Sequence, residues 1–313
     1  MTFKKPKFWD YQRPNLLSHI LLPLTFPLII NNFLLSLKKN TEKNLRLKKI
    51  CIGNIYIGGT AKTPLTIKIY QILNKLGIKV GTIKKFYKNH YDEQKMLSEK
   101  TILYCEKNRI QALNKAIRDN IDVVVFDDGL QDRSINYDLK IVCFNSIKFI
   151  GNGRLIPAGP LREKINSISK YDVAFINGNE KDNSKLKLLL RKHNPHIEIF
   201  ESNYKAINIK EFNIDEEYII FSGIGNPESF KQTLINNNIK ITKEIIFPDH
   251  HKYTQKDIDY IRVQARRLNS KILTTEKDYI KIKSSKNDDI KYLKVELDIK
   301  KEDKLIDYLK MHI

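Results

Sequence analysis

The sequence predicts an α/β fold in which helices flank a mainly parallel sheet. Three observations lead to this prediction. Short β-branched runs alternate with helical patterns, a glycine-rich loop joins the first of these runs to a helix, and two adjacent aspartates follow a later run. A smaller second α/β domain and an apolar N-terminal segment complete the expected architecture.

Length and charge restrict the class of protein. The chain has 313 residues, enough for two domains, and 41% of them are hydrophobic, which excludes a disordered tail or a collagen-like chain. The formal net charge of +20 would attract nucleotide phosphates, nucleic acid or an anionic membrane, although a general bias towards lysine would give the same charge without a site. Cys51, Cys105 and Cys143 are widely spaced, which favours reduced thiols over disulfides or a zinc site.

The N-terminal region raises the question of membrane contact. No charged residue lies between Pro14 and Leu37, and this length would permit a membrane span. Because Pro23 and Pro27 would interrupt a single helix, we expect a pair of helices in the membrane interface from Leu16 to Leu37. A buried hairpin of core helices is the alternative. The expected cationic flanks are Lys4, Lys5, Lys7 and Arg13 before the segment and Lys38 and Lys39 after it.

The elements of the two predicted domains follow in order. In the first domain we expect strands over Lys49–Ile52, Ile78–Ile83, Val123–Phe126, Ile141–Phe144 and Val173–Ile176, with helices over Lys62–Leu76 and Arg109–Arg118. In the second we expect a strand over Tyr218–Phe221, a helix opened by Asn226 and Pro227, and a helix started by Thr254 with Asp257. A polar stretch places the boundary near Glu201. The predicted divisions are 1–40 (membrane interface), 41–200 (nucleotide binding) and 201–313 (smaller domain).

The loop from Gly53 to Pro64 has the setting of a phosphate-binding loop, because it follows a strand and opens a helix. Lys62 would supply charge to the γ-phosphate of ATP, and Thr63 a hydroxyl ligand for Mg²⁺. The expected nucleotide-binding residues are Gly58, Gly59, Thr60, Ala61, Lys62 and Thr63. Tyr56 stands where the first glycine of the pattern belongs, and Ala61 replaces the glycine before the lysine. A simple strand-to-helix turn is the alternative.

Two carboxylates follow the buried-strand run that ends at Phe126. Asp127 and Asp128 stand where a P-loop enzyme places the acidic group that holds Mg²⁺. An ordinary Asp-Gly turn is the alternative. Since both motifs occur in the expected order, they favour a nucleotide site of the P-loop type that also holds Mg²⁺.

The motifs together resemble the tetraacyldisaccharide 4'-kinase family of lipid A biosynthesis. The resemblance rests on Gly58–Pro64, Asp127–Gln131 and Gly151–Glu163, and continues through Phe8-Trp9, Ser222–Pro227, Pro248–His251 and Thr274–Asp278. It implies ATP-dependent phosphorylation of the 4'-hydroxyl of an acylated glucosamine disaccharide 1-phosphate. It also implies peripheral or monotopic attachment to the cytoplasmic face of the bacterial inner membrane. The family fold is a P-loop domain and a smaller α/β domain that closes the active-site cleft.

The resemblance also implies roles for individual residues. Asp92 matches the catalytic base of the family, and His250 its partner, although adjacent His251 leaves that choice open. Lys62 is the third expected catalytic residue. The pair of Asp92 and His250 is expected to meet across the domain boundary when the cleft closes. Expected substrate contacts are Tyr87, Glu93, Gln131, Asn152 and Arg162. The alternatives are a helix-capping role for Asp92 and a structural salt bridge for Arg162.

The chain also departs from the family pattern. Lys84-Lys85-Phe86-Tyr87 stands where Ser-Arg-Gly-Tyr is usual, and Asp132 where histidine is common. Two other functions therefore stay open: a P-loop NTPase that drives a partner, and a catalytically weakened protein that binds anionic lipid. Nucleic acid is not an expected partner, because the aromatic residues lack a base-stacking pattern. No obligate protein partner is evident.

Overall fold

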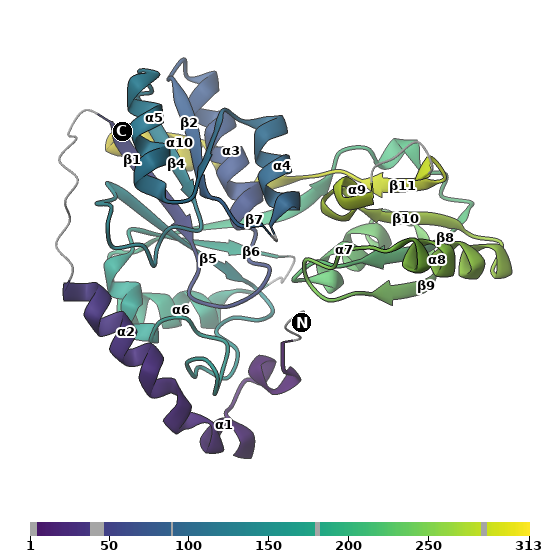
Figure 1. Ribbon diagram of the computed structural model, residues 1–313, viewed down its shortest axis with the longest axis horizontal. Coiled ribbons are helices and arrows are strands. Elements are labelled where there is room, and N and C mark those ends of the chain that lie inside the picture. Colours follow the sequence, from purple (N-terminus) through teal and green to yellow (C-terminus); the bar gives the residue numbers. More distant parts are fainter. Residues whose placement is uncertain (1–4, 38–46, 89, 179–181, 283–286) are drawn as a thin grey trace. The chain divides into compact units, whose positions relative to one another are not determined.

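The computed structural model describes residues 5–37, 47–88, 90–178, 182–282 and 287–313 (Figure 1). They form two compact units, and both units are discontinuous in the sequence. The larger unit comprises Lys5–Phe86, Lys100–Asn203 and Ile299–Ile313, and the smaller unit contains Tyr87–Glu99 and Tyr204–Asp298. The predicted division near residue 200 therefore differs from these units for two segments. The segment Tyr87–Glu99, which carries Asp92, belongs to the smaller unit, and the C-terminal segment Ile299–Ile313 belongs to the larger unit.

A largely parallel sheet forms the centre of the larger unit. Its strand order is β12-β7-β6-β5-β1-β4-β2-β3, and the strands from β1 to β7 pair in parallel. The strands are β1 (Lys48–Gly53), β2 (Val80–Lys85), β3 (Leu103–Glu106), β4 (Val123–Asp127), β5 (Leu139–Asn145), β6 (Val173–Asn177), β7 (Glu198–Ala206) and β12 (Val295–Ile299). Their β-branched and aromatic residues are buried, as expected for a sheet covered on both faces.

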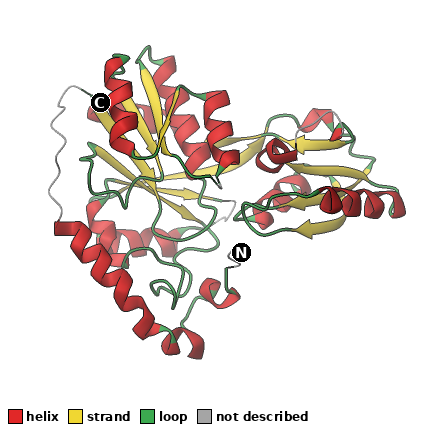
Figure 2. Ribbon diagram, in the orientation of Figure 1, coloured by secondary structure: helices red, strands yellow, loops and turns green. Residues whose placement is uncertain are grey.

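Helices lie on both sides of this sheet (Figure 2). They include α3 (Lys62–Lys75), α5 (Arg109–Arg118), α6 (Ser184–His193), α10 (Glu302–His312) and the 3₁₀ helix η3 (Ile165–Lys170). Helix α3 packs on β1, β2 and β4, and α5 packs on β2 and β3. The connection between β1 and α3 therefore emerges next to the carboxyl end of β4, where Asp127 and Asp128 stand.

The N-terminal segment packs on the larger unit through a few specific contacts. It consists of η1 (Lys7–Asp10), α1 (Leu16–Ile20), η2 (Leu22–Thr25) and α2 (Phe26–Leu37). The indole N–H of Trp9, whose side chain is 1% exposed, donates to the Pro157 carbonyl at 3.0 Å. Gly151 has a φ of +56°, and a Cβ there would lie 2.1 Å from the Trp9 carbonyl oxygen, so this contact requires glycine. Among the described residues, no helix combines the length and the apolar character that a membrane span needs.

The smaller unit contains a parallel sheet with the order β11-β10-β8-β9. Its strands are β8 (Glu217–Ser222), β9 (Lys240–Ile246), β10 (Lys271–Thr275) and β11 (Ile290–Leu293). The helices are α4 (Tyr91–Lys100), α7 (Pro227–Ile235), α8 (Gln255–Arg267), α9 (Glu276–Ile282) and the 3₁₀ helix η4 (Ile209–Glu211). Because α4 packs with this unit, its first-turn carboxylates belong to it.

The predicted α/β class and parallel sheet are confirmed, with differences at some boundaries. Strand β2 begins at Val80 rather than Ile78, because the Ile78 N–H bonds back to the Leu73 carbonyl and still belongs to the end of α3. The predicted cap at Thr254 is a full capping box. Helix α7 begins at Pro227 as expected, but the Asn226 side chain makes no cap hydrogen bond. The cationic flanks Lys4, Lys38 and Lys39 lie outside the described residues.

Candidate active site

The loop between β1 and α3 is shaped by two residues with positive φ. Gly58 has a φ of 139°, and Ala61, which immediately precedes α3, has a φ of 65° and is left-handed. Alanine is costly in this region by about 1–2 kcal/mol, so the loop imposes a conformation that glycine would adopt more easily. No side chain caps the first turn of α3, which leaves its N–H groups facing outward for an anion.

Polar side chains hold the inside of the loop. The buried Asn54 amide donates to the Tyr56 carbonyl at 2.6 Å and to the Thr60 hydroxyl at 3.0 Å. Tyr56 is 1% exposed, and its hydroxyl bonds to the Asp10 carboxylate and accepts from Lys5 at 2.7 Å. The residue that departs from the phosphate-loop pattern therefore anchors the N-terminal segment, which explains why glycine is absent there.

Asp127 is fully buried at the end of β4 and uses only one of its oxygens within the described chain. Its Oδ2 accepts from the Thr63 hydroxyl at 2.9 Å and from the Lys84 ammonium at 2.6 Å. Its Oδ1 is buried and has no hydrogen-bond partner among the described residues. An unpaired buried carboxylate oxygen is costly, and a bound ion or an ordered water is the usual solution.

Asp128 brings three cationic side chains to the same place. It has a φ of 60°, and its Oδ1 lies 2.9 Å from Arg162 Nη1 and 3.8 Å from Lys62 Nζ. Arg109 donates to the Asp128 carbonyl. The Arg162 backbone N–H donates to the Ile55 carbonyl at 2.7 Å, which attaches the long Gly151–Glu163 motif to the phosphate loop.

These residues fit a magnesium ion bound with ATP. Thr63, Asp127 and Asp128 offer the hard oxygen ligands that Mg²⁺ prefers, and no donor in the described part of the chain competes for Oδ1 of Asp127. Lys62 is the first residue of α3, and its Nζ lies 3.8 Å from Oδ1 of Asp128. This position suits a side chain that contacts a phosphate group bound at the N-terminus of the helix. The structure thus brings together Lys62, Thr63 and the two aspartates that the sequence predicts for one site.

Gln131 and Asn152 occupy structural positions. Gln131 donates to the Asn54 carbonyl at 3.0 Å and to Glu163 at 2.9 Å, and it accepts from Arg162 at 3.3 Å. The Asn152 amide is 4% exposed and donates to the Ser18 hydroxyl at 2.8 Å and the Ala158 carbonyl at 3.0 Å. Both side chains connect elements of the chain, and substrate contact by them stays a prediction.

A second charged cluster surrounds Asp92 in the smaller unit. Asp92 is 2% exposed in the first turn of α4, and its Oδ2 lies 3.2 Å from His250 Nδ1 and 3.3 Å from Lys281 Nζ. Its Oδ1 accepts from the Glu93 backbone N–H at 3.0 Å. Lys277 Nζ lies 3.6 Å from Asp92, 3.2 Å from Glu93 and 3.6 Å from Asp249. Both oxygens of Asp92 therefore have partners.

These neighbours set the charge of Asp92. Burial by itself raises the pKa of this carboxyl group, but the hydrogen bond from His250 and the charges of Lys277 and Lys281 outweigh it. The net effect holds the pKa of Asp92 well below its ordinary value. The carboxylate groups around Lys277 in turn raise the pKa of that ammonium despite its burial. Asp92 is thus ionised at neutral pH.

The structure decides between the two adjacent histidines. His250, which has a φ of 58°, faces Asp92, whereas His251 Nε2 lies 3.1 Å from Asp257 and its ring stacks on Phe247. His250 and Asp92 are already in contact within one compact unit, because α4 packs with residues 204–298. The expectation that they meet only when a cleft closes is therefore wrong.

Tyr87 and Glu93 lie near this pair. The Tyr87 ring, which is 42% exposed, lies 5.2 Å from the His90 ring, and that ring stacks on His250 at 4.4 Å. His90, Glu93 and His250 offer atoms within 4.8 Å of one another, the spacing of a metal site. The rings of His90 and His250 are stacked with an interplanar angle of 10°. Because the lone pair of an imidazole nitrogen lies in the plane of its ring, the lone pairs of two parallel rings do not point towards one ion. Glu93 also forms an ion pair with Lys277, at 3.2 Å. This geometry does not favour a metal.

The sequence reasoning missed Lys84, Lys277 and Lys281. Lys277 belongs to the Thr274–Asp278 motif, for which no role was predicted, and Lys281 follows one helical turn later on α9. That i, i+4 spacing places both ammonium groups on one face. The signal in the sequence was that Lys84 directly follows the predicted strand Ile78–Ile83. The structure adds that Lys84 lies opposite Asp127 in the register of β2 and β4.

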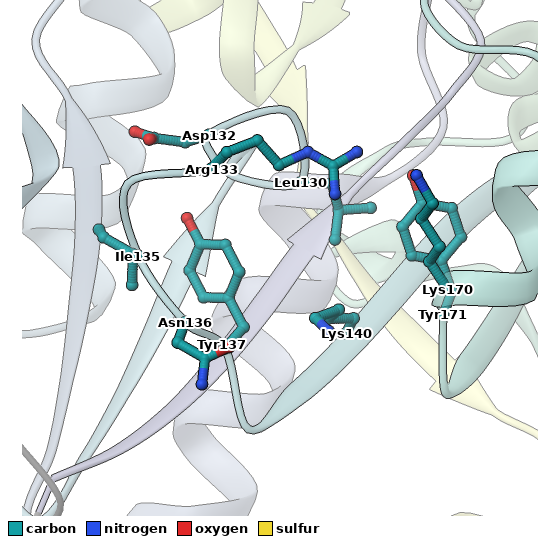
Figure 3. Close-up of a pocket in the computed structure, with 9 residues that line it drawn as sticks. All are labelled: Leu130, Asp132, Arg133, Ile135, Asn136, Tyr137, Lys140, Lys170 and Tyr171. Atoms are coloured by element: carbon teal, nitrogen blue, oxygen red, sulfur yellow. The ribbon is translucent and has the colours of Figure 1, made fainter. Parts of the chain in front are cut away.

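A pocket of about 320 Å³ lies elsewhere in the larger unit (Figure 3). Its lining consists of Leu130, Asp132, Arg133, Ile135, Asn136, Tyr137, Lys140, Lys170 and Tyr171. Figure 3 shows the Arg133 side chain extending towards the part formed by Lys170 and Tyr171. None of the predicted site residues lines it, so this pocket does not locate the phosphate chemistry.

The chain is similar to known proteins over nearly its whole length. Residues 18–313 match the model of the family described as tetraacyldisaccharide-1-P 4'-kinase. A tetraacyldisaccharide 4'-kinase of Pelagibacter ubique is 46% identical over 310 residues, covering 99% of this chain and 98% of that protein. One from Rickettsia felis is 32% identical over 319 residues, covering 96% of this chain and 94% of that protein.

A solved structure has a similar fold. It is the "apo" form of LpxK from Aquifex aeolicus in complex with ATP, which is 22% identical to this chain with a TM-score of 0.68. The match covers 95% of this chain and 99% of that one. At this identity the comparison shows the shared fold.

Proposed function

The chain belongs to the tetraacyldisaccharide-1-P 4'-kinase family and is an ATP-dependent kinase of lipid A biosynthesis, and we propose which of its residues carry out the phosphoryl transfer. Its acceptor is a lipid A precursor. In the proposed reaction, the 4'-hydroxyl oxygen of the acylated disaccharide 1-phosphate bonds to the γ-phosphorus of ATP. The bond between that phosphorus and the β,γ-bridging oxygen breaks, and ADP leaves.

We assign the nucleotide to the loop between β1 and α3. The uncapped first turn of α3 and the backbone N–H groups from Gly58 to Ala61 would bind the phosphate oxygens, and Lys62 would neutralise charge on the group in transfer. Thr63, Asp127 and Asp128 would hold Mg²⁺. When bound, that ion would supply charge neutralisation to the β- and γ-phosphates.

We assign the proton of the sugar hydroxyl to the Asp92–His250 pair. Asp92 is ionised, so it can accept the proton, and its hydrogen bond with His250 Nδ1 fixes its orientation. Because Lys277 and Lys281 also stabilise the charged form, Asp92 is a weak base. This agrees with phosphoryl transfer through a loose transition state, in which positioning contributes more than proton abstraction.

The observation that carries the proposal is the buried Oδ1 of Asp127, which has no hydrogen-bond partner among the described residues, on a carboxylate whose other oxygen accepts from Thr63. The test is transfer of ³²P from γ-labelled ATP to the acylated disaccharide 1-phosphate, with ATP hydrolysis measured in parallel without lipid. We expect labelled lipid from the wild type and a loss of about 10³-fold in Lys62→Ala. Equal ATP consumption with and without the lipid would indicate an NTPase, and binding of lipid without ATP consumption would indicate a lipid-binding protein.

We also propose that the N-terminal segment attaches the kinase to the cytoplasmic surface of the inner membrane. Its exposed apolar side chains are Leu16, Leu17, Ile20, Leu24, Phe26, Ile30, Phe33 and Leu34. A buried hairpin would cover these side chains, so that alternative is wrong for the described part of the segment. Leu28 and Ile29 pack on the core of the larger unit, which leaves the other side of α2 for lipid. With 12 residues, α2 spans about 18 Å, shorter than the hydrocarbon core of a bilayer.

The test of this attachment is sedimentation with vesicles of phosphatidylethanolamine and phosphatidylglycerol. We expect the triple variant Leu16→Ser, Leu17→Ser and Ile20→Ser to lose most vesicle binding and to retain ATP binding. The matched control is Leu188→Ser on α6, since Leu188 is 74% exposed and Leu16 is 75% exposed. Moderate salt should weaken the binding only partly, because apolar burial contributes most of it. Complete release by salt would contradict the proposal. A wild-type dimer that the triple variant does not form would also contradict it, because the exposed side chains would then contact a second copy of the chain.

A further inference from the structure

Lys84 is a buried lysine inside the proposed nucleotide site. Its side chain is 4% exposed, and its ammonium lies 2.6 Å from Oδ2 of Asp127, a residue with no exposed surface. A buried ammonium and a buried carboxylate each carry a large desolvation cost, which close pairing offsets. The parallel register of β2 and β4 places the two residues opposite each other, so the backbone itself enforces the contact.

The pairing divides the two oxygens of Asp127 between different roles. Oδ2 receives both the Lys84 ammonium and the Thr63 hydroxyl, at 2.6 and 2.9 Å. A carboxylate fixed through one oxygen cannot rotate without losing both of these bonds. Oδ1, which has no partner among the described residues, is consequently held in one direction.

We propose that Lys84 is a positioning residue that fixes Asp127 as a metal ligand and partly neutralises it before Mg²⁺ binds. The inference rests on the proposed metal role of Asp127. A fixed ammonium next to the carboxylate repels a divalent cation, so the site binds free Mg²⁺ weakly. ATP would add the negative charge that the site lacks, so Mg²⁺ would bind together with the nucleotide.

Lys84→Met tests this role, because methionine has a similar length without the charge. Asp127 then becomes an uncompensated buried anion, so the variant is less stable without metal than the wild type. Free Mg²⁺ supplies the missing positive charge. We expect Mg²⁺ alone to raise the Tm of Lys84→Met more than that of the wild type, and to bind the variant about tenfold more tightly. The measurement is thermal unfolding across a titration with magnesium chloride, with and without a non-hydrolysable ATP analogue.

Two further variants make the result specific. Lys49→Met removes another buried lysine, near the start of β1 on the other side of β4, and should leave the Mg²⁺ response as in the wild type. The double variant Lys84→Met and Asp127→Asn removes both charges, so it should recover stability and lose the response to Mg²⁺. This neutral pair keeps the experiment decisive if Lys84→Met folds poorly, because recovery shows that the lost charge, not the lost volume, caused the defect.

The outcomes separate this proposal from the metal site itself. If Lys84→Met and the wild type respond equally to free Mg²⁺, Lys84 is only a structural partner and the proposal is wrong, while the metal site stands. If the wild type shows no stabilisation by Mg²⁺ together with the ATP analogue, the proposed metal role of Asp127 fails, and the role of Lys84 fails with it.

Discussion

Asp127 and Asp92 are both buried and both pair with lysine, but their two oxygens have different partners. In the larger unit, Asp127 uses Oδ2 for Lys84 and Thr63 and leaves Oδ1 without a partner among the described residues. In the smaller unit, both oxygens of Asp92 are engaged, by His250 and Lys281 and by the Glu93 backbone.

This difference indicates what each carboxylate can do. An open oxygen in a buried site has a strong tendency to acquire a cation, which suits a metal ligand. A carboxylate that two lysines and a histidine surround is already neutralised, which suits a residue that orients a hydroxyl group and accepts its proton briefly. Burial and proximity to lysine are common to both, so only the distribution of partners over the two oxygens separates the roles.

The largest effect should come from removing the Asp92–His250 pair. We expect Asp92→Ala and His250→Ala each to lower kcat by about 10²–10⁴-fold, with little change in KM for ATP. Because the two residues act as one unit, the double variant should be scarcely slower than the slower single variant. Steady-state kinetics with the lipid acceptor measures this, and His251→Ala is the matched control, since His251 contacts Asp257 instead. Additive losses, or a larger loss in His251→Ala, would contradict the assignment.

A smaller effect should appear in the pH dependence of Lys281→Met. Lys281 helps to keep the pKa of Asp92 low, so its removal should raise that pKa. Since only the ionised carboxylate accepts a proton, activity should fall first at acid pH and recover as the pH rises.

The pH–rate profile of kcat measures this effect. The exposed Lys256 on α8 provides a control, because Lys256→Met removes the same charge from a residue that is not among the groups named as lowering the pKa of Asp92, so the acid limb should stay unchanged. An acid limb that does not move in Lys281→Met would show that Lys281 contributes only packing.

The smallest effect should come from Ala61→Gly. Ala61 has a φ of 65°, where glycine is less strained, but glycine also costs more conformational entropy on folding. We expect activity to be unchanged or raised, and the free energy of unfolding to change by less than about 1 kcal/mol. Equilibrium unfolding in urea and the transfer assay measure these quantities. A strong loss of activity would mean that the loop binds phosphate in another geometry.

Elements whose signal lies within a few neighbouring residues were predicted from the sequence. The apolar run from Val123 to Phe126 indicates a buried strand, and Thr254 with Asp257 indicates the start of a helix, and both were predicted correctly. Helix α4 and strand β9 are two of the elements that were not predicted. Both are polar and only partly buried, so they lack the periodicity that marks an element. Tertiary packing stabilises them, and a single sequence does not display that packing.

The site shows the same division. Lys62, Thr63 and Asp127 follow from motifs in which spacing reflects the shape of a phosphate. The partners of Asp92 do not follow in this way, because Lys277 is 184 residues away from Glu93, whose carboxylate it contacts. Lysine is abundant in this chain, and nothing in the sequence distinguishes a buried ammonium from an exposed one.

The most direct test of the account is Mn²⁺ binding, measured by electron paramagnetic resonance in the presence of a non-hydrolysable ATP analogue. We expect the wild type and Asp92→Asn to bind the Mn²⁺–nucleotide complex with similar affinity, and Asp127→Asn to lose the protein-bound signal. Thr63→Val, which keeps both buried charges, should weaken binding as well and serves if Asp127→Asn does not fold. Retention of the bound signal in both Asp127→Asn and Thr63→Val, or its loss in folded Asp92→Asn, would contradict the central claim that the open oxygen of Asp127, and not Asp92, receives the metal.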